Sequence, residues 1–156
     1  MSAVEQRLAD LGVVLPPSVP PVANFVPFVQ SGNLLFISGQ ICLSAERKVP
    51  VEFQGKLGGG VSDENGRAAA RLCAVNLLAQ VKVALGNLDR VVRCVRLSGF
   101  INAAPDYTAL PQVMNGASDL IVEAFGDKGR HARIAVGVAT LPANCAVEVE
   151  GIFEVE

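Results

Sequence analysis

The spacing of apolar and polar residues predicts a chain of two long helices and five strands. Two apolar, β-rich runs flank a Ser-Gly-Asn turn, which is typical of a hairpin, and Pro27 favours an edge position for the first of them. The first long helix begins after Ser62, a typical N-cap residue, and ends at Gly86. In chain order the predicted elements are a hairpin over 25–38, a helix over 62–86, a strand over 91–101, a helix over roughly 107–125, and two strands within 130–142 and 146–150.

This order of elements predicts an α+β fold in which two helices pack over one face of a single mixed sheet. The helix over 62–86 is expected to turn Arg67, Arg71 and Gln80 towards solvent. We expect the last two strands to pair with each other as an antiparallel hairpin, joined at the Leu141-Pro142 step.

The first 21 residues differ in pattern from the rest of the chain. Residues 2–11 place Val4, Leu8 and Leu11 on one side of a short amphipathic helix, and four prolines between positions 16 and 21 predict an extended connector. We therefore expect one domain over 22–156, preceded by an N-terminal helix and a proline-rich connector over 1–21.

Two charged side chains interrupt the apolar C-terminal strands. Arg133 enters the first strand, and Glu148 alternates with Val147 and Val149 in the second. In an antiparallel hairpin these charges would lie within reach of each other, where an arginine offers a fork for a carboxylate and a glutamate can hold water or a proton. The same residues also permit a structural ion pair of Arg133 with Glu148 or Glu150, and a solvated Glu148 without a catalytic role.

Composition narrows the classes of partner. The chain is 51% hydrophobic and only 18% charged, a balance that favours a heavily buried sheet or a surface covered by partner subunits. Its net charge of −2 and the absence of a basic run argue against binding to nucleic acid. No apolar signal core and no stretch of roughly 20 apolar residues is evident. We therefore expect a cytoplasmic protein that does not bind membranes.

The candidate chemistry of cysteine, histidine and glycine is limited. The four cysteines form no Cys-x-x-Cys pair and the chain has one histidine, so we predict buried thiols and no metal site. The triple glycine at 58–60 precedes a helix as in a phosphate-binding loop, but the lysine and Ser/Thr of a P-loop do not follow in the right order, which favours a flexible loop.

Three segments resemble the RidA family, also called the YjgF/YER057c/UK114 or L-PSP endoribonuclease family. They are Asn33-Leu-Leu-Phe-Ile-Ser-Gly-Gln40, the helix over 62–86, and the stretch from Ala132-Arg133 through Leu-Pro to Val-Glu-Val-Glu150. The resemblance covers roughly residues 22–155. It implies a chorismate-mutase-like fold and a homotrimer with sites in clefts between subunits. The implied activity, which needs no cofactor, is hydrolysis of reactive 2-imino acids and enamines to 2-oxo acids and ammonia.

The resemblance also assigns roles by position. Arg133 corresponds to the arginine that grips the substrate carboxylate, and Glu148 to the glutamate that positions the attacking water. Backbone groups near Gly39 and Ala135 would hold the imine end of the substrate. The family often has a tyrosine where this chain has Phe25, which can pack against a ligand but cannot donate a hydrogen bond. The residues implied to line the substrate pocket are Phe25, Ser38, Gly39, Asn115 and Ala135.

Three functions stay open from the sequence. The first is the imine and enamine deaminase, and the second is a non-catalytic trimer that uses the same arginine to bind small carboxylates. The third, endoribonuclease activity, is disfavoured because the chain lacks a basic groove and an aromatic stacking surface. His131 is expected at the rim of the cleft or in a capping role rather than as a general base.

Overall fold

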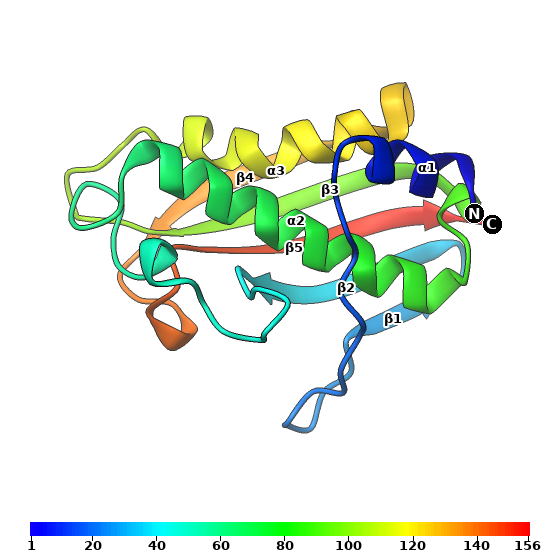
Figure 1. The fold of residues 1–156 in the computed structure, drawn as a ribbon, viewed down its shortest axis with the longest axis horizontal. Coiled ribbons are helices and arrows are strands. Elements are labelled where there is room, and N and C mark those ends of the chain that lie inside the picture. The colour runs from blue at the N-terminus through cyan, green and yellow to red at the C-terminus, as the bar shows by residue number, and fades with distance from the viewer.

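Five strands form one mixed sheet in the order β1-β2-β5-β3-β4 in the computed structural model, which describes residues 1–156 (Figure 1). All three α-helices lie over one face of this sheet, and α2 and α3 run side by side. The predicted α+β class, with helices over one face of a mixed sheet, is therefore confirmed. The elements are α1 (Ala3–Asp10), β1 (Phe28–Ser31), β2 (Leu34–Ile41), α2 (Asp63–Leu85), β3 (Val91–Asn102), α3 (Leu110–Phe125), β4 (Ala132–Val138) and β5 (Val147–Val155), with short 3-10 turns at 51–53, 88–90, 126–129 and 142–144.

The predicted C-terminal hairpin is wrong. Strand β4 pairs only with β3, in parallel, whereas β5 lies between β2 and β3 and is antiparallel to both. The segment β3-α3-β4 is a strand-helix-strand crossover, a connection that lets two consecutive strands pair in parallel. The loop over 139–146 then carries the chain back across β3, so that β4 is left as an edge strand.

Helix α2 is the central helix of the core. Ser62 caps its N-terminus through a bond from the Asn65 amide to Oγ at 3.1 Å, and Gly86 ends it in a left-handed conformation (φ 74°), as predicted. Its length and apolar composition would suffice to cross a membrane, but 61% of its most apolar window is buried inside the protein. Helix α3 approaches it closely at Gly116, where a Cβ would lie 2.0 Å from the Arg67 carbonyl oxygen.

The N-terminal helix is docked on the domain. The predicted helix forms as α1, which buries Val4 and Leu8. The carboxylate of Asp89 lies at the N-terminus of α1 and accepts hydrogen bonds from two backbone amides, at 2.9 and 3.0 Å. The connector that follows crosses α2 on its outer side (Figure 1). There Ser18 donates a hydrogen bond to Gln80 at 3.2 Å. Gln80 is 9% exposed, so its predicted solvent exposure is wrong because the connector covers it.

The face of the sheet opposite the helices carries apolar side chains without cover. Val29, Phe36 and Ile134 are 52%, 41% and 43% exposed and lie on strands β1, β2 and β4. On the helix side, the core contains the four cysteines, all of them buried free thiols, as predicted. The high apolar fraction of the chain therefore has two origins, a thick core on one face and an uncovered apolar surface on the other.

Candidate functional site

Arg133 lies on the helix side of the edge strand β4. It is in register with Leu97, a fully buried core residue of β3, and paired neighbours in a sheet point to the same face. Its guanidinium donates from Nη1 to Oγ of Ser118 at 3.1 Å and from Nη2 to the carbonyl oxygen of Pro111 at 3.3 Å, both on α3. The side chain is therefore held along α3 by two neutral acceptors.

No carboxylate of the chain neutralises Arg133. The three ion pairs in the structure join Arg71 to Glu123, Lys82 to Glu5 and Arg130 to Asp127. The alternative of a structural ion pair between Arg133 and Glu148 or Glu150 is therefore wrong within this chain. A guanidinium has five N–H donors, and two are used here, so Arg133 keeps donors that can bind an external carboxylate.

Residues predicted near Arg133 gather at the same edge. Asn115 lies on α3 between Pro111 and Ser118, one helical turn from each, and is exposed without a hydrogen-bond partner. Ala135 follows Arg133 by two positions along β4 and therefore faces the same side. We call Arg133, Ser118, His131, Asn115 and Ala135 the Arg133 cluster.

His131 belongs to this cluster through a contact that the sequence pattern did not indicate. Its Nε2 lies 2.9 Å from Oγ of Ser118, and its Nδ1 lies 2.6 Å from the carbonyl oxygen of Gly129. Burial lowers the pKa of His131, and the positive charge of Arg133 adds to this lowering, whereas the bond to Gly129 opposes it. The ring is therefore neutral near neutral pH.

Glu148 lies on the other face of the sheet. On β5 it stands between the buried Val147 and Val149 and is in register with the half-buried Phe100, so it points away from the helices. Burial raises the pKa of Glu148, and the charge of Glu150 on the same face raises it further. A carboxylate with a raised pKa in a half-buried setting is a suitable general base or holder of a water molecule.

Gly39 permits a close approach of β2 to Glu148. A Cβ at position 39 would lie 3.2 Å from both Cδ and Oε1 of Glu148, at the register shift between Ile37 and Gln40. Ser38 holds the segment before β1 in place, because its Oγ donates a hydrogen bond to the Val26 carbonyl oxygen at 2.7 Å. Strand β1 begins only at Phe28, so the segment over 25–27 precedes the predicted hairpin strand rather than belonging to it.

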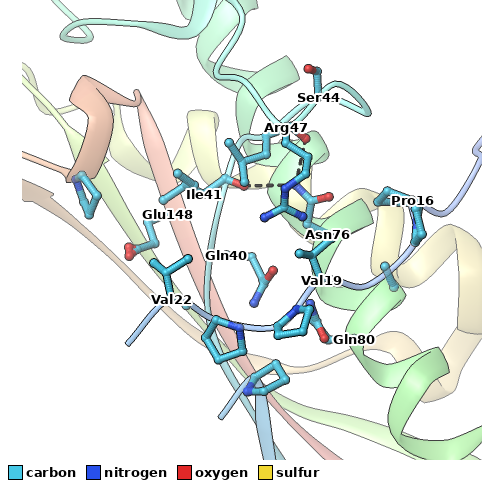
Figure 2. Close-up of a pocket in the computed structure, with 18 of the residues that line it drawn as sticks. Pro16, Val19, Val22, Gln40, Ile41, Ser44, Arg47, Asn76, Gln80 and Glu148 are labelled. Atoms are coloured by element: carbon cyan, nitrogen blue, oxygen red, sulfur yellow. Dashed lines mark hydrogen bonds between the residues drawn. The ribbon is translucent and has the colours of Figure 1, made fainter. Parts of the chain in front are cut away.

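A pocket adjoins Glu148, with a volume of about 480 Å³. Figure 2 shows Glu148 at one side of it, with Arg47, Gln40 and Gln80 around its interior. Phe25, which is 55% exposed, belongs to its wall together with Gly39. The pocket therefore contains the predicted residues Glu148, Gly39 and Phe25. We call it the Glu148 pocket.

The sequence prediction missed much of the wall of this pocket. The proline-rich connector forms one side of it, and Asn76 and Gln80 of α2 contribute to the other. Asn76 is held there by two bonds, from Nδ2 to the carbonyl oxygens of Ile41 and Leu43, both at 3.1 Å. The run of prolines predicted the extended form of this segment, but nothing in the local sequence indicated that it packs against α2. The connector residues in the wall are Pro16, Pro17, Val19, Pro20, Pro21 and Val22.

Arg133 and Glu148 do not meet within one chain. They lie on opposite faces of the sheet, and β3 separates their strands. Adjacent strands are about 4.8 Å apart, so the two strand intervals alone place them roughly 10 Å apart. The predicted juxtaposition in a hairpin is therefore wrong, and the chain presents two separate clusters. No group of three His, Cys, Asp or Glu side chains is arranged to hold a metal ion.

The fold and the two clusters define a class of protein. A five-stranded mixed sheet with helices on one face presents a free arginine at one edge and a half-buried glutamate on its open face. Residues 5–154 match the family described as "YjgF/chorismate mutase-like, putative endoribonuclease". The chain therefore belongs to this family, which is the RidA family that its motifs resemble.

Similar proteins match most of the length of the chain. The chain is 45% identical to Protein TCP17 of Trypanosoma cruzi, over 97% of this chain and 93% of that protein. It is 29% identical to a protein of Dermatophagoides farinae named 2-iminobutanoate/2-iminopropanoate deaminase, over 87% and 89%. The crystal structure of Atu1372 from Agrobacterium tumefaciens, a protein of unknown function, is similar with a TM-score of 0.90 and 45% identity, over 98% of this chain and 94% of that chain.

Proposed function

We propose that this protein hydrolyses 2-imino acids and their enamine tautomers to 2-oxo acids and ammonia in a cleft between two copies of the chain. The observation that carries the proposal is the Arg133 guanidinium, which is held by two neutral acceptors and left without a carboxylate partner. The name of the relative from Dermatophagoides farinae, 2-iminobutanoate/2-iminopropanoate deaminase, supports the same reaction.

Each charged residue supplies one part of the reaction. Arg133 binds the substrate carboxylate through parallel hydrogen bonds, which fixes the imine carbon in place. Glu148 of the other copy orients a water molecule and takes its proton as the oxygen adds to the C=N carbon. Glu148 returns this proton to the nitrogen, which gives a carbinolamine. It then takes the hydroxyl proton of the carbinolamine and passes it to the nitrogen as the C–N bond breaks, so that ammonia leaves and the C=O of a 2-oxo acid forms. No electrons are transferred, so the step needs no redox partner.

The separation of the clusters is the reason for a second copy. The carboxylate and the reacting carbon of a 2-imino acid are directly bonded, so one substrate molecule cannot reach both Arg133 and Glu148 of a single chain. A head-to-tail arrangement brings the Arg133 edge of one copy to the Glu148 pocket of the next, and such contacts form a closed ring when the rotation between copies closes. We propose the homotrimer that the family resemblance implies.

The surface of the chain favours this association. Strand β4, which carries Arg133, is an edge with unpaired backbone groups, and Ile134 on its open face is 43% exposed. Val29 and Phe36 extend the uncovered apolar surface across β1 and β2. Apolar strand faces of this kind are typical of subunit interfaces.

The test is decay of 2-iminopropanoate, generated by an amino acid oxidase and followed by its reaction with semicarbazide. We expect wild-type protein to accelerate imine loss and to release one ammonia per 2-oxo acid. Arg133→Ala is expected to lose about a hundredfold in kcat/KM, since a charged hydrogen-bonded pair contributes about 1.5–3 kcal/mol. Arg133→Lys is expected to restore only part of this loss, because an ammonium cannot form the fork.

Two further variants make the result specific. Arg130→Ala is the matched control, because its side chain is 74% exposed and its loss is expected to leave activity unchanged. Glu148→Gln is expected to abolish turnover while pyruvate, the product carboxylate, still binds. If wild-type protein leaves the decay rate of the imine unchanged yet binds pyruvate through Arg133, the chain is a carboxylate-binding module and the hydrolase proposal fails.

A further inference from the structure

We propose that Ser118 and His131 are positioning residues for Arg133 and together hold its guanidinium ready for a carboxylate. This inference rests on the proposed function and adds to it a positioning role for two residues, which neither the sequence motifs nor the relatives assign. It is built on one continuous series of hydrogen bonds that links α3, the turn at 126–129 and strand β4.

The series begins at a fixed backbone acceptor. The carbonyl oxygen of Gly129 lies 2.6 Å from Nδ1 of His131, and a carbonyl oxygen can only accept. The proton of the neutral ring is therefore on Nδ1, and Nε2 carries a lone pair. Gly129 itself is held against α3, where a Cβ would lie 2.4 Å from the carbonyl oxygen of Ile121. The acceptor that sets the tautomer is therefore held in place by the fold.

The tautomer of His131 determines the direction of the next two bonds. Because Nε2 can only accept, the Ser118 hydroxyl donates to it across 2.9 Å. The lone pairs of Ser118 Oγ then face outward, and one of them accepts from Nη1 of Arg133 at 3.1 Å. Every donor in the series meets an acceptor, and the guanidinium is the last member.

The effect of this series is to fix the orientation of the Arg133 side chain. His131 immediately precedes β4, and its Nε2 and the Nη1 of Arg133 both contact Oγ of Ser118, so the two side chains lie on the same side. The carbonyl oxygen of Pro111 holds Nη2 at 3.3 Å while Ser118 holds Nη1. Two anchors on one rigid helix restrict the rotamers of a long side chain before any ligand arrives, so less freedom is lost on binding.

The inference predicts an effect on binding rather than on chemistry. With Ser118→Ala the Nη1 anchor is lost, and KM for 2-iminopropanoate is expected to rise about tenfold, the effect of one net hydrogen bond, with kcat nearly unchanged. His131→Phe removes the acceptor for Ser118 and is expected to raise KM in the same direction. The two effects should not add, because both variants break the same series.

Conservative variants separate positioning from general damage to the fold. Ser118→Thr keeps a hydroxyl, and His131→Gln can place an amide oxygen where Nε2 accepts, so both are expected to restore KM. Gln112→Ala is the control, since Gln112 is exposed on α3 without a hydrogen bond. An unchanged KM in Ser118→Ala, or the same rise in Ser118→Thr as in Ser118→Ala, would overturn the inference.

A spectroscopic test needs no activity. The chain has a single histidine, so a nitrogen-15 NMR spectrum of the side chain reports on His131 alone. We expect the neutral Nδ1–H tautomer in wild-type protein and a shifted Nε2 resonance in Ser118→Ala. An Nε2–H tautomer in the wild type would overturn the positioning series. Failure of imine hydrolysis with the expected tautomer present would count against the proposed function alone.

Discussion

Arg133 and Glu148 point to opposite faces of the same sheet, with strand β3 between the strands that carry them. The two residues that the motifs assign to one reaction are thus separated in one chain by the thickness of the sheet and two strand intervals. Both the Arg133 cluster and the Glu148 pocket nevertheless have features that suit a ligand. Arg133 has free donors at the edge, and Glu148 adjoins a pocket of about 480 Å³. The hydrolysis that we propose therefore requires residues from two copies of the chain.

We expect the raised pKa of Glu148 to set the acidic limb of the pH profile of imine hydrolysis. A general base acts as the carboxylate, so kcat/KM is expected to fall as the pH drops through the pKa of Glu148, at a higher pH than for an ordinary glutamate. Glu150→Gln removes the like charge and is expected to move this limb to lower pH. Burial is the larger cause, so the limb should move only part of the way to the ordinary value. Glu154→Gln, further along β5, is the control, and an unmoved limb in Glu150→Gln would contradict the assignment.

Protonation of His131 should destabilise the fold. Its pKa is lowered in the folded state from an ordinary value of 6.5, so below pH 6.5 the unfolded chain binds more protons than the folded chain. The free energy of unfolding is therefore expected to fall as the pH drops from 6.5 towards the lowered pKa, and to be unaffected by this group above 6.5. Urea unfolding at several pH values tests this, and His131→Gln is expected to show a smaller dependence. A wild-type stability that rises as the pH falls through this window would contradict it.

Much of the fold could be predicted from local patterns. The caps at Ser62 and Gly86 and the amphipathic α1 depend on neighbouring residues in the sequence, and all are confirmed. Pairing of distant strands was not predictable in the same way. Two strands joined by a short loop resemble a hairpin, yet the crossover β3-α3-β4 places β4 at the edge and lets β5 enter between β2 and β3.

The candidate site shows the same limit. The motifs identified Arg133 and Glu148 as candidate site residues, but they could not show that the two residues lie on opposite faces of the sheet. The bond between Ser118 and His131 depends on how α3 lies along β4, and Gln80 is covered only because the connector returns across α2. Such contacts between distant segments follow from tertiary packing and have no local signal.

The approach of α2 and α3 should make Gly116 sensitive to substitution. In Gly116→Ala the added Cβ would lie 2.0 Å from the backbone oxygen of Arg67, and a backbone atom cannot move aside as a side chain can. We expect a loss of about 1–3 kcal/mol or more in the free energy of unfolding, as for an overpacked core. Gly60→Ala has no neighbour within 4 Å and is expected to change stability by less than about 0.5 kcal/mol. Equal stabilities of the two variants in urea would contradict the close packing.

Complementation between two inactive variants tests the central claim most directly. Arg133→Ala and Glu148→Gln chains, carried on different tags, are co-expressed, and mixed oligomers are purified through both tags. Each variant alone is expected to be inactive. In a closed trimer with head-to-tail contacts, every mixed ring contains one cleft with both intact residues, so turnover should return to about one third of wild type. Mixed oligomers as inactive as their parents would contradict a site shared between copies.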